Sequence, residues 1–211
     1  MILEAALRIV DDEGLEAMTM RRLASALGVN PMSIYHHLPN KAAVVAGLAD
    51  LVFAEVELAD AGDTVSWPEQ LSNAARVYRN ALRAHPNLAL QVLSDPAAVS
   101  DVVVITMEPF YRALERAGLS PRRIFEAANT LIDFVHGFTL GEASVRADTF
   151  DLAPDLLARV RQLPPDRAPT LTRVVETLGE EGLHYDFDSG FESGLRVLVN
   201  GFETTWGARA R

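Results

Sequence analysis

Cysteine is absent from the 211-residue chain, and so are long apolar runs. Without cysteine the protein has no disulfide framework, no thiolate-bound metal and no cysteine nucleophile. A membrane-spanning helix needs roughly 20 consecutive apolar residues, and no run approaches that length. Residues 1–10 include Glu4 and Arg8, which is typical of an amphipathic helix and not of a signal peptide. We therefore expect a cytoplasmic protein that has no membrane partner.

Strand patterns and common catalytic motifs are also scarce. Apolar residues recur at helical spacing almost everywhere, which predicts an all-α fold. The sequence has no glycine-rich phosphate loop, no HExxH zinc motif and no GxSxG nucleophile elbow. These absences argue against an enzyme, and no residue pattern indicates a cofactor.

Acidic residues are unevenly distributed along the chain. The formal net charge is −10, which by itself disfavours binding to nucleic acid because phosphates repel an acidic surface. The 31 residues from Thr19 to Ala49, however, contain no Asp or Glu. This segment is therefore the one that phosphates can approach. Its basic and imidazole side chains are Arg21, Arg22, His36, His37 and Lys41.

The same segment has the pattern of a helix-turn-helix. Thr19 is a favourable N-cap for one short helix, and Asn30 followed by Pro31 begins a second. The two helices are joined by the turn at 28–30, whose glycine ends the first helix. The helices expected in this part of the chain are Ile2–Glu13, Met20–Leu27, Pro31–Leu38 and Lys41–Leu58.

The short helix that begins at Pro31 has an outward face suited to DNA. Ile34 and Leu38 lie four residues apart and are expected to face the core. Hydroxyl groups bind phosphates or base edges in the major groove, and apolar tips contact thymine methyl groups. Arg21 is placed to reach a guanine edge, and Lys41, at the start of the next helix, to bind a phosphate. The outward positions of the short helix are Met32, Ser33, Tyr35, His36 and His37.

The run from Met18 to Leu48 resembles the DNA-binding domain of the tetracycline repressor family of bacterial transcriptional regulators. The matching features are, in order, Thr19, Arg21, Leu23-Ala24, Leu27-Gly28-Val29, Tyr35, His37 and Asn40-Lys41. Met20 departs from the family pattern, in which a hydroxyl residue is common, and a basic arm before the first helix is not expected. The resemblance implies that DNA is contacted by Thr19, Arg21, Met32, Ser33, Tyr35, His37 and Lys41.

The remainder of the chain predicts further helices, with a proline-rich loop at 163–169. The segment 115–141, which ends in HGFTLG, also resembles the interface helix of the tetracycline repressors. The helices expected here are Trp67–His85, Asn87–Ser94, Val99–Gly118, Ser120–Arg146, Leu171–Gly179 and Asp186–Ala210.

Glycines on two of these helices indicate a dimer. Gly137 and Gly141 notch one helix, and the last helix carries a smooth stripe beside its apolar stripe. Glycine costs about 1 kcal/mol in a helix interior, so several in one helix indicate close packing against another subunit. Packing within one subunit is the alternative. The smooth stripe consists of Gly190, Gly194, Val197 and Gly201.

A polar stripe on the helix at 120–146 is a candidate for effector binding. Asn129, Asp133 and His136 recur at i, i+4 and i+7 on an otherwise apolar helix. Polar groups in an apolar wall need partners, which a ligand or the dimer interface can supply. As metal ligands, Asp133 and His136 are too few, so no metal is expected. The candidate ligand-binding residues are His85, Met107, Tyr111, Asn129, Asp133, His136 and Thr139.

Together these patterns predict two domains and a regulatory function. Residues 1–45 are expected to form a helix-turn-helix DNA-binding domain, and residues 46–211 a larger helical domain for effector binding and dimerisation. The expected function is that of a homodimeric transcriptional repressor, which binds palindromic operator DNA and is released by a small molecule. The alternative is a dimeric helical protein that binds a small molecule but no DNA. The presence of Arg21, Tyr35, His37 and Lys41 argues against that alternative.

Overall fold

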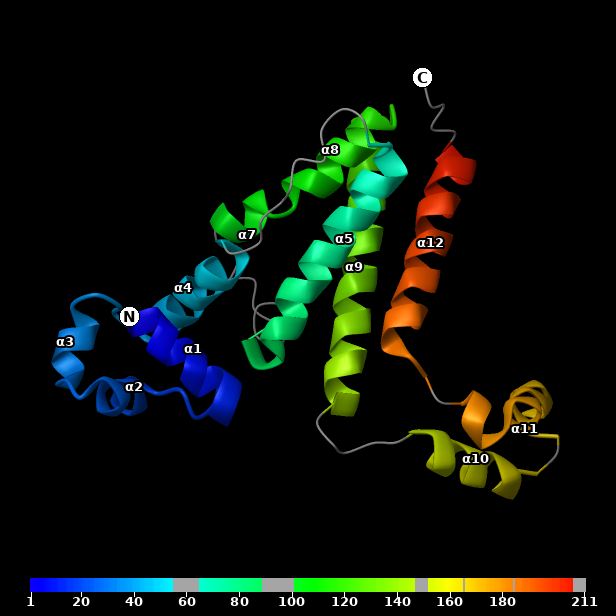
Figure 1. Ribbon diagram of the computed structural model, residues 1–211, viewed down its shortest axis with the longest axis horizontal. Coiled ribbons are helices and arrows are strands. Elements are labelled where there is room, and N and C mark those ends of the chain that lie inside the picture. Colours follow the sequence, from blue (N-terminus) through cyan, green and yellow to red (C-terminus); the bar gives the residue numbers. More distant parts are fainter. Residues whose placement is uncertain (55–64, 89–100, 147–151, 165, 184, 207–211) are drawn as a thin grey trace. The chain divides into compact units, whose positions relative to one another are not determined.

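The all-α prediction is confirmed. In the computed structural model every regular element of the described residues is a helix (Figure 1). The chain divides into two compact units, one of Met1–Leu140 with Leu195–Arg211 and the other of Gly141–Gly194. None of the described helices combines the length and the apolar composition that a bilayer-spanning segment requires. The described residues are 1–54, 65–88, 101–146, 152–164, 166–183 and 185–206.

The first unit begins with four helices that we call the head. The bounds predicted for the first two are confirmed, and residues 55–58 of the fourth predicted helix lie outside the described residues. The second helix begins after Thr19, whose Oγ1 accepts a hydrogen bond from the Arg22 amide at 3.0 Å. It ends at Gly28, which is left-handed with a φ of 66°. The helices of the head are α1 (Ile2–Glu13), α2 (Met20–Leu27), α3 (Pro31–Tyr35) and α4 (Lys41–Ala54).

The third predicted helix is wrong at its end, because α3 stops at Tyr35 and not at Leu38. The amides of His37 and Leu38 both donate to the Ile34 carbonyl at 2.9 Å, so the chain tightens into a turn. Pro39 follows directly, and proline disfavours a helical backbone in the residue before it. This local conflict shortens the helix predicted to contact DNA.

The head has an apolar core of its own. α1 packs against α2 and α4, and α2 packs against α3. Gly47 lets α1 and α4 approach closely, because a Cβ there would lie 2.8 Å from Leu3 Cδ2. Burying one large apolar side chain contributes about 1.5–3 kcal/mol, so this core holds the head helices in one arrangement. Its fully buried side chains include Met18, Leu23, Ile34, Val44 and Leu48.

The rest of the first unit contains helices from the middle and from the end of the chain. α5 packs on α8, and α4 packs on α7. The single helix predicted over 99–118 is instead two, separated by a turn at Thr106–Met107. Pro109 explains the break, because it has no amide hydrogen to donate to the Ile105 carbonyl. The predicted helix at 87–94 lies mostly outside the described residues. The further helices are α5 (Trp67–Ala84), α7 (Asp101–Ile105), α8 (Glu108–Arg116), α9 (Pro121–Arg146) and α12 (Phe187–Trp206), the last two shared with the second unit.

The second unit contains α10 (Leu152–Gln162) and α11 (Pro169–Gly182), which pack against each other. The sequence analysis predicts no helix at α10, which ends directly before the predicted proline-rich loop at 163–169. α11 continues past its predicted end at Gly179, where a φ of 64° kinks the helix. The apolar contacts of this pair are made by Leu157, Val160 and Val175, with Leu183 against them.

Candidate DNA-binding and effector sites

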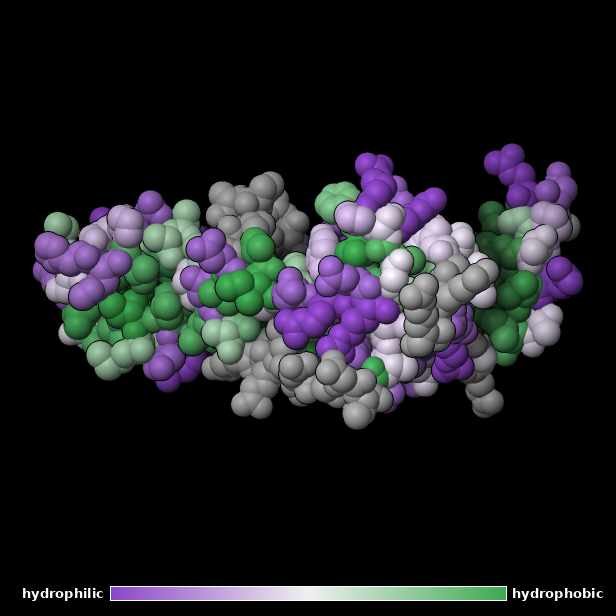
Figure 2. Space-filling view, turned by 90° about the horizontal axis from the view of Figure 1, so that it is seen from above, coloured by the Kyte–Doolittle hydropathy of each residue, from purple (hydrophilic) through white to green (hydrophobic). Residues whose placement is uncertain are grey.

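α3 presents the face that was expected to contact DNA. Ile34 is buried, whereas Met32 and Tyr35 are 63% and 43% exposed. In the described part of the chain, none of the outward side chains of α3 and the turn after it makes a hydrogen bond or ion pair. Figure 2 shows apolar and hydrophilic surface interspersed over the N-terminal helices. The other exposed side chains of this face are Ser33, His36 and His37.

Two N-caps determine where α2 and α3 begin. Asn30 Oδ1 accepts a hydrogen bond from the Met32 amide at 2.9 Å, and Pro31 occupies the first helical position. The Thr19 hydroxyl caps α2 in the same way. Arg21, in the first turn of α2, is exposed to solvent. The two caps thus fix the start of α2, which carries the exposed Arg21, and the start of α3, which carries the exposed face.

Two other basic side chains of the acid-free segment contact the end of α1 and the connection that follows it. Arg22 donates two hydrogen bonds to the Glu13 carboxylate, one of them from Nε to Oε2 at 3.2 Å. Hydrogen bonding to Arg22 lowers the pKa of Glu13, and the same bond raises the pKa of Arg22. Lys41 Nζ donates to the Leu15 carbonyl at 2.8 Å. Lys41, which was expected to bind a phosphate, therefore also ties the start of α4 to this connection.

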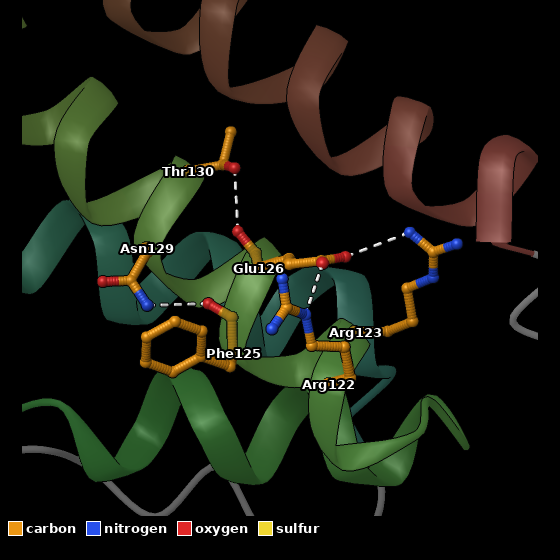
Figure 3. A network of polar contacts seen from close by, with 6 residues as sticks. All are labelled: Arg122, Arg123, Phe125, Glu126, Asn129 and Thr130. Atoms are coloured by element: carbon orange, nitrogen blue, oxygen red, sulfur yellow. Dashed lines mark hydrogen bonds and ion pairs between the residues drawn. The ribbon is translucent and has the colours of Figure 1, made fainter.

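The polar residues predicted on α9 differ in their surroundings. Asn129 Nδ2 donates to the Phe125 carbonyl at 2.7 Å (Figure 3). Thr139 is buried, and its Oγ1 donates to the Val135 carbonyl at 2.8 Å. Both bonds lie within the helix, whereas Asp133 is exposed to solvent. The predicted stripe is thus not one continuous polar surface.

An ion-pair network lies at the beginning of α9 (Figure 3). Glu126 accepts hydrogen bonds from Arg122 Nε at 2.7 Å and from Arg123 Nη1 at 3.0 Å. The hydrogen bond from Arg122 is the main cause that lowers the pKa of Glu126. The Arg123 guanidinium also lies 5.2 Å from the ring centroid of Trp206. This cation–π contact joins the beginning of α9 to the end of α12.

His136 pairs with Tyr78 in an aromatic cluster. Tyr78 Oη lies 2.8 Å from His136 Nε2, and the tyrosine is buried. Phe53 of α4 stacks on Tyr78 with 5.6 Å between ring centroids, and Phe110 of α8 meets it edge-on at 6.0 Å. Burial raises the pKa of Tyr78. Burial also lowers the pKa of His136, and the negative charge of nearby Asp133 offsets part of that decrease. Both side chains are therefore neutral at pH 7.

Sequence reasoning missed Tyr78 and its neighbour Arg79, which is also buried. The Arg79 guanidinium lies 5.4 Å from the ring centroid of Phe138. A signal for Tyr78 exists in the sequence, because it falls on the same helical face as two buried leucines, Leu71 and Leu82. A phenol hydroxyl on an apolar face needs a buried partner, but the pattern does not say which residue supplies it.

The remaining candidates for ligand binding lie on other segments. His85, directly after α5, has its Nδ1 2.9 Å from Asp11 Oδ2 of α1. Met107 precedes α8 and Tyr111 lies on it, and both are half-buried. The structure therefore brings His136 to Tyr78, and it brings His85 to the head.

Parts of α9 and α12 carry the smooth surface that the glycines predict. A Cβ at Gly137 or at Gly201 would meet no described atom within 4 Å, and Val197 is 68% exposed. Gly190 differs from the prediction, because a Cβ there would collide with the Tyr185 hydroxyl of the same chain. The stripe on α12 is thus open at Val197 and Gly201 and closed at Gly190.

Two family profiles match most of the chain. The one described as "Bacterial regulatory proteins, tetR family" matches residues 2–48. The one described as "Tetracyclin repressor-like, C-terminal domain" matches residues 60–206. The first match contains the helix-turn-helix, and the second contains the helices of the Tyr78–His136 pair.

Individual proteins are similar over nearly all of this chain. The HTH-type transcriptional repressor DrrR1 of Streptomyces coeruleorubidus is 31% identical over 212 residues, which cover 96% of this chain and 76% of that protein. The tetracycline repressor protein class A from transposon 1721 of Escherichia coli is 31% identical over 206 residues, covering 95% and 88%. The TetR family protein ActR of Streptomyces coelicolor, in a crystal structure with actinorhodin, has a TM-score of 0.83 at 28% identity, covering 99% and 97%.

Proposed function

Because the chain belongs to the tetracycline repressor family of bacterial regulators, we propose that it is a homodimeric repressor of transcription that binds a palindromic operator and is released by a small molecule. In this proposal residues 1–45 bind the DNA, and residues 46–211 bind the effector and form the dimer. Its relatives include transcriptional repressors, and one structural neighbour holds a bound small molecule.

The exposed face of α3 is the observation that carries the proposal. It lies in a segment without Asp or Glu, inside a chain whose net charge is −10. Tyr35, His37 and Ser33 are open to solvent, and Arg21 is exposed on α2. Such side chains on a short helix fit the major groove, where an arginine can bind a guanine edge with two hydrogen bonds. The acidic remainder of the chain favours DNA contact at this face alone.

The smooth surface on α9 and α12 supports a dimer. Gly137 and Gly201 leave room for another backbone, and Val197 offers an exposed apolar side chain there. A two-fold dimer presents two copies of α3 to half-sites about 34 Å apart, which is one turn of DNA. Dimerisation is therefore what makes the operator a palindrome.

The aromatic cluster around Tyr78 and His136 is where we place the effector. Both side chains are neutral and polar within an apolar surrounding, which suits an uncharged or partly aromatic molecule that offers hydrogen-bonding oxygens. The bound actinorhodin in the ActR structure supports this effector class. Asn129, Asp133, Thr139, Met107 and Tyr111 remain proposed ligand contacts from the sequence. His85 remains one as well, although its imidazole already contacts the Asp11 carboxylate.

A stacking contact gives the effector a route to the head. Phe53 lies in the last turn of α4, and its ring stacks on Tyr78. A ligand that moves Tyr78 or His136 therefore moves the helix whose first residue, Lys41, borders the DNA face. A ligand that prefers the conformation with poorly spaced heads lowers operator affinity by the same factor by which DNA lowers ligand affinity.

The full-length protein tests this proposal directly. It is used to enrich duplexes from a random pool, and the enriched sequence is measured against a scrambled duplex. We expect a palindrome with half-sites about 10 base pairs apart and an affinity at least about 10³-fold above the scrambled duplex. A pool that shows no enrichment overturns the repressor function and leaves a ligand-binding protein without DNA binding.

The effector is then tested with actinorhodin and with tetracycline on the enriched duplex. We expect at least one of them to weaken operator binding by about fivefold or more, the lower end of ordinary allosteric coupling. If neither changes the affinity, the effector class proposed here is wrong, although the DNA-binding function stands.

A further inference from the structure

A polar cluster connects α1 of the head to the segment after α5. His85 Nδ1 lies 3.0 Å and 2.9 Å from the two carboxylate oxygens of Asp11. Asn87 Nδ2 donates to the Val10 carbonyl at 3.0 Å and to the Asp11 carbonyl at 3.4 Å. Both carbonyls belong to the last turn of α1, and the Val10 carbonyl also accepts a hydrogen bond from the Gly14 amide at 3.0 Å. We call His85, Asn87 and Asp11 the latch.

The latch is a polar contact that is separate from the apolar packing between the helices. The side chains of His85 and Asp11 are 22% and 32% exposed, so the contact lies at the edge of the apolar core. The head buries apolar side chains of α1–α4, and Leu88, next to Asn87, is buried as well. Polar contacts of this kind add direction to an interface, because hydrogen bonds weaken steeply when their angle changes. Apolar packing alone tolerates sliding of one element on another.

We propose that the latch sets the half-site spacing that the dimer accepts, by holding the head at one angle to the helices that form the dimer. This inference rests on the proposed function, because it presupposes operator binding by a dimer. His85, Asn87 and Asp11 act as positioning residues, since none of them lies on the face expected to touch DNA. With the latch closed, only one separation and rotation of the two copies of α3 is presented to DNA.

Breaking the latch should widen the range of operators without weakening contacts to DNA. One additional base pair between half-sites moves one of them by about 3.4 Å and rotates it by about 34–36°. A dimer whose heads are fixed loses contacts to the displaced half-site. A dimer whose heads can rotate keeps those contacts. The double variant His85→Ala/Asn87→Ala removes both donors of the latch and leaves the α3 face unchanged.

The experiment compares the enriched operator with versions lengthened and shortened by one base pair. For the wild-type protein we expect a strong preference for the enriched spacing. For His85→Ala/Asn87→Ala we expect that preference to fall about tenfold, which corresponds to about 1.4 kcal/mol. Affinity for a scrambled duplex should stay the same. The matched control is Asn80→Ala, an exposed residue of α5, which should keep the wild-type preference.

A swapped pair separates positioning from stability. Asp11→His/His85→Asp keeps an imidazole and a carboxylate at the same place with their sides exchanged, so it should restore much of the spacing preference that His85→Ala loses. Thermal unfolding of each variant shows whether the fold is intact. If the alanine variant unfolds, the swap and His85→Leu carry the test. Leucine keeps much of the side-chain volume but has no hydrogen-bond donor, so a loss of spacing preference in folded His85→Leu supports the latch.

The outcomes distinguish the two proposals. If the wild-type protein enriches no duplex, operator binding fails and the latch proposal fails with it. If a duplex is enriched and the folded latch variants keep the full wild-type spacing preference, the latch is overturned and the proposed function stands. An equal loss of affinity for all spacings and for scrambled DNA also overturns it, because the residues then serve only the folding of the head.

Discussion

The outward face of α3 and the polar residues of α9 differ in where their polar groups find partners. Tyr35 and His37 are exposed, and within the described residues their side chains make no hydrogen bond. On α9, Thr139 donates to a carbonyl of its own helix, and His136 pairs with Tyr78. One region keeps its polar groups available to water, and the other uses them inside the protein.

This difference bears on how each region can bind a partner. Exposed polar groups exchange water for a ligand at little cost, so the proposed DNA binding by the α3 face requires no broken internal hydrogen bond. A buried pair loses its hydrogen bond when a ligand takes one member, and an unsatisfied buried group costs about 1–3 kcal/mol. An effector at Tyr78 and His136 must therefore replace bonds that the protein already makes. Such an exchange links effector binding to a change of conformation.

The largest expected effect comes from an exposed residue of the head. Arg21→Ala should weaken binding to the enriched operator by roughly 5- to 150-fold, the range for one lost bidentate base contact. Binding to scrambled DNA should change much less. Fluorescence anisotropy with both duplexes measures the two affinities. Arg8→Ala, an exposed arginine of α1, is the control and should leave both nearly unchanged.

Lys41 is predicted to contact DNA, and its Nζ also donates a hydrogen bond to the Leu15 carbonyl. Lys41→Met keeps the length of the side chain and removes the charge. If Lys41 binds a phosphate as expected, affinity falls for all duplexes and the slope of log K against log salt becomes shallower by about 0.9. Titrations at several salt concentrations measure the slope. An unchanged slope together with a lower melting temperature would assign Lys41 to its bond with the Leu15 carbonyl alone.

The same substitution, tyrosine to phenylalanine, can be made at a buried hydroxyl and at an exposed one. Tyr78→Phe removes the buried hydroxyl that bonds His136 and should lower the free energy of unfolding by about 1 kcal/mol. Tyr35→Phe removes a hydroxyl that is open to solvent and should leave the free energy of unfolding unchanged. Urea denaturation measures both. An equal change in the free energy of unfolding in both variants would show that the buried and the exposed hydroxyl do not differ in their contribution to stability.

The smallest expected effect is a pH dependence that arises from His136. Its pKa in the folded protein is lowered, mainly by burial, so the unfolded chain binds a proton more readily than the folded one. The contribution to stability is present above the unfolded pKa of about 6.5 and is lost as pH falls through the lower folded pKa. Urea denaturation at a series of pH values measures it, and His136→Asn should flatten the curve. A wild-type curve that rises toward acid pH contradicts this assignment.

Local signals predicted the head well. The bounds of α1 and α2, the caps at Thr19 and Asn30 and the outward face of α3 all follow from contacts within one or two turns. The same reasoning failed where two local signals compete. Pro109 splits a continuous apolar pattern into α7 and α8, and prolines around α10 conceal a helix that a second helix stabilises.

The surroundings of His136 could be predicted only in part. The stripe on α9 identified His136, but its partner Tyr78 is 58 residues away in sequence and belongs to another helix. His85 was grouped with the ligand contacts because it ends a helix, whereas its partner Asp11 is 74 residues away. Periodicity shows which face of a helix is buried and does not show which helix covers it.

Local sequence alone specifies α1, α2, the caps at Thr19 and Asn30 and the family to which the chain belongs. These properties depend on hydrogen bonds between neighbours and on a motif within one short segment. Tertiary packing, and no local signal, brings Tyr78 to His136, Phe53 to Tyr78 and His85 to Asp11. Such pairs form when packing brings distant helices together, and many arrangements of amphipathic helices satisfy the same pattern of apolar residues.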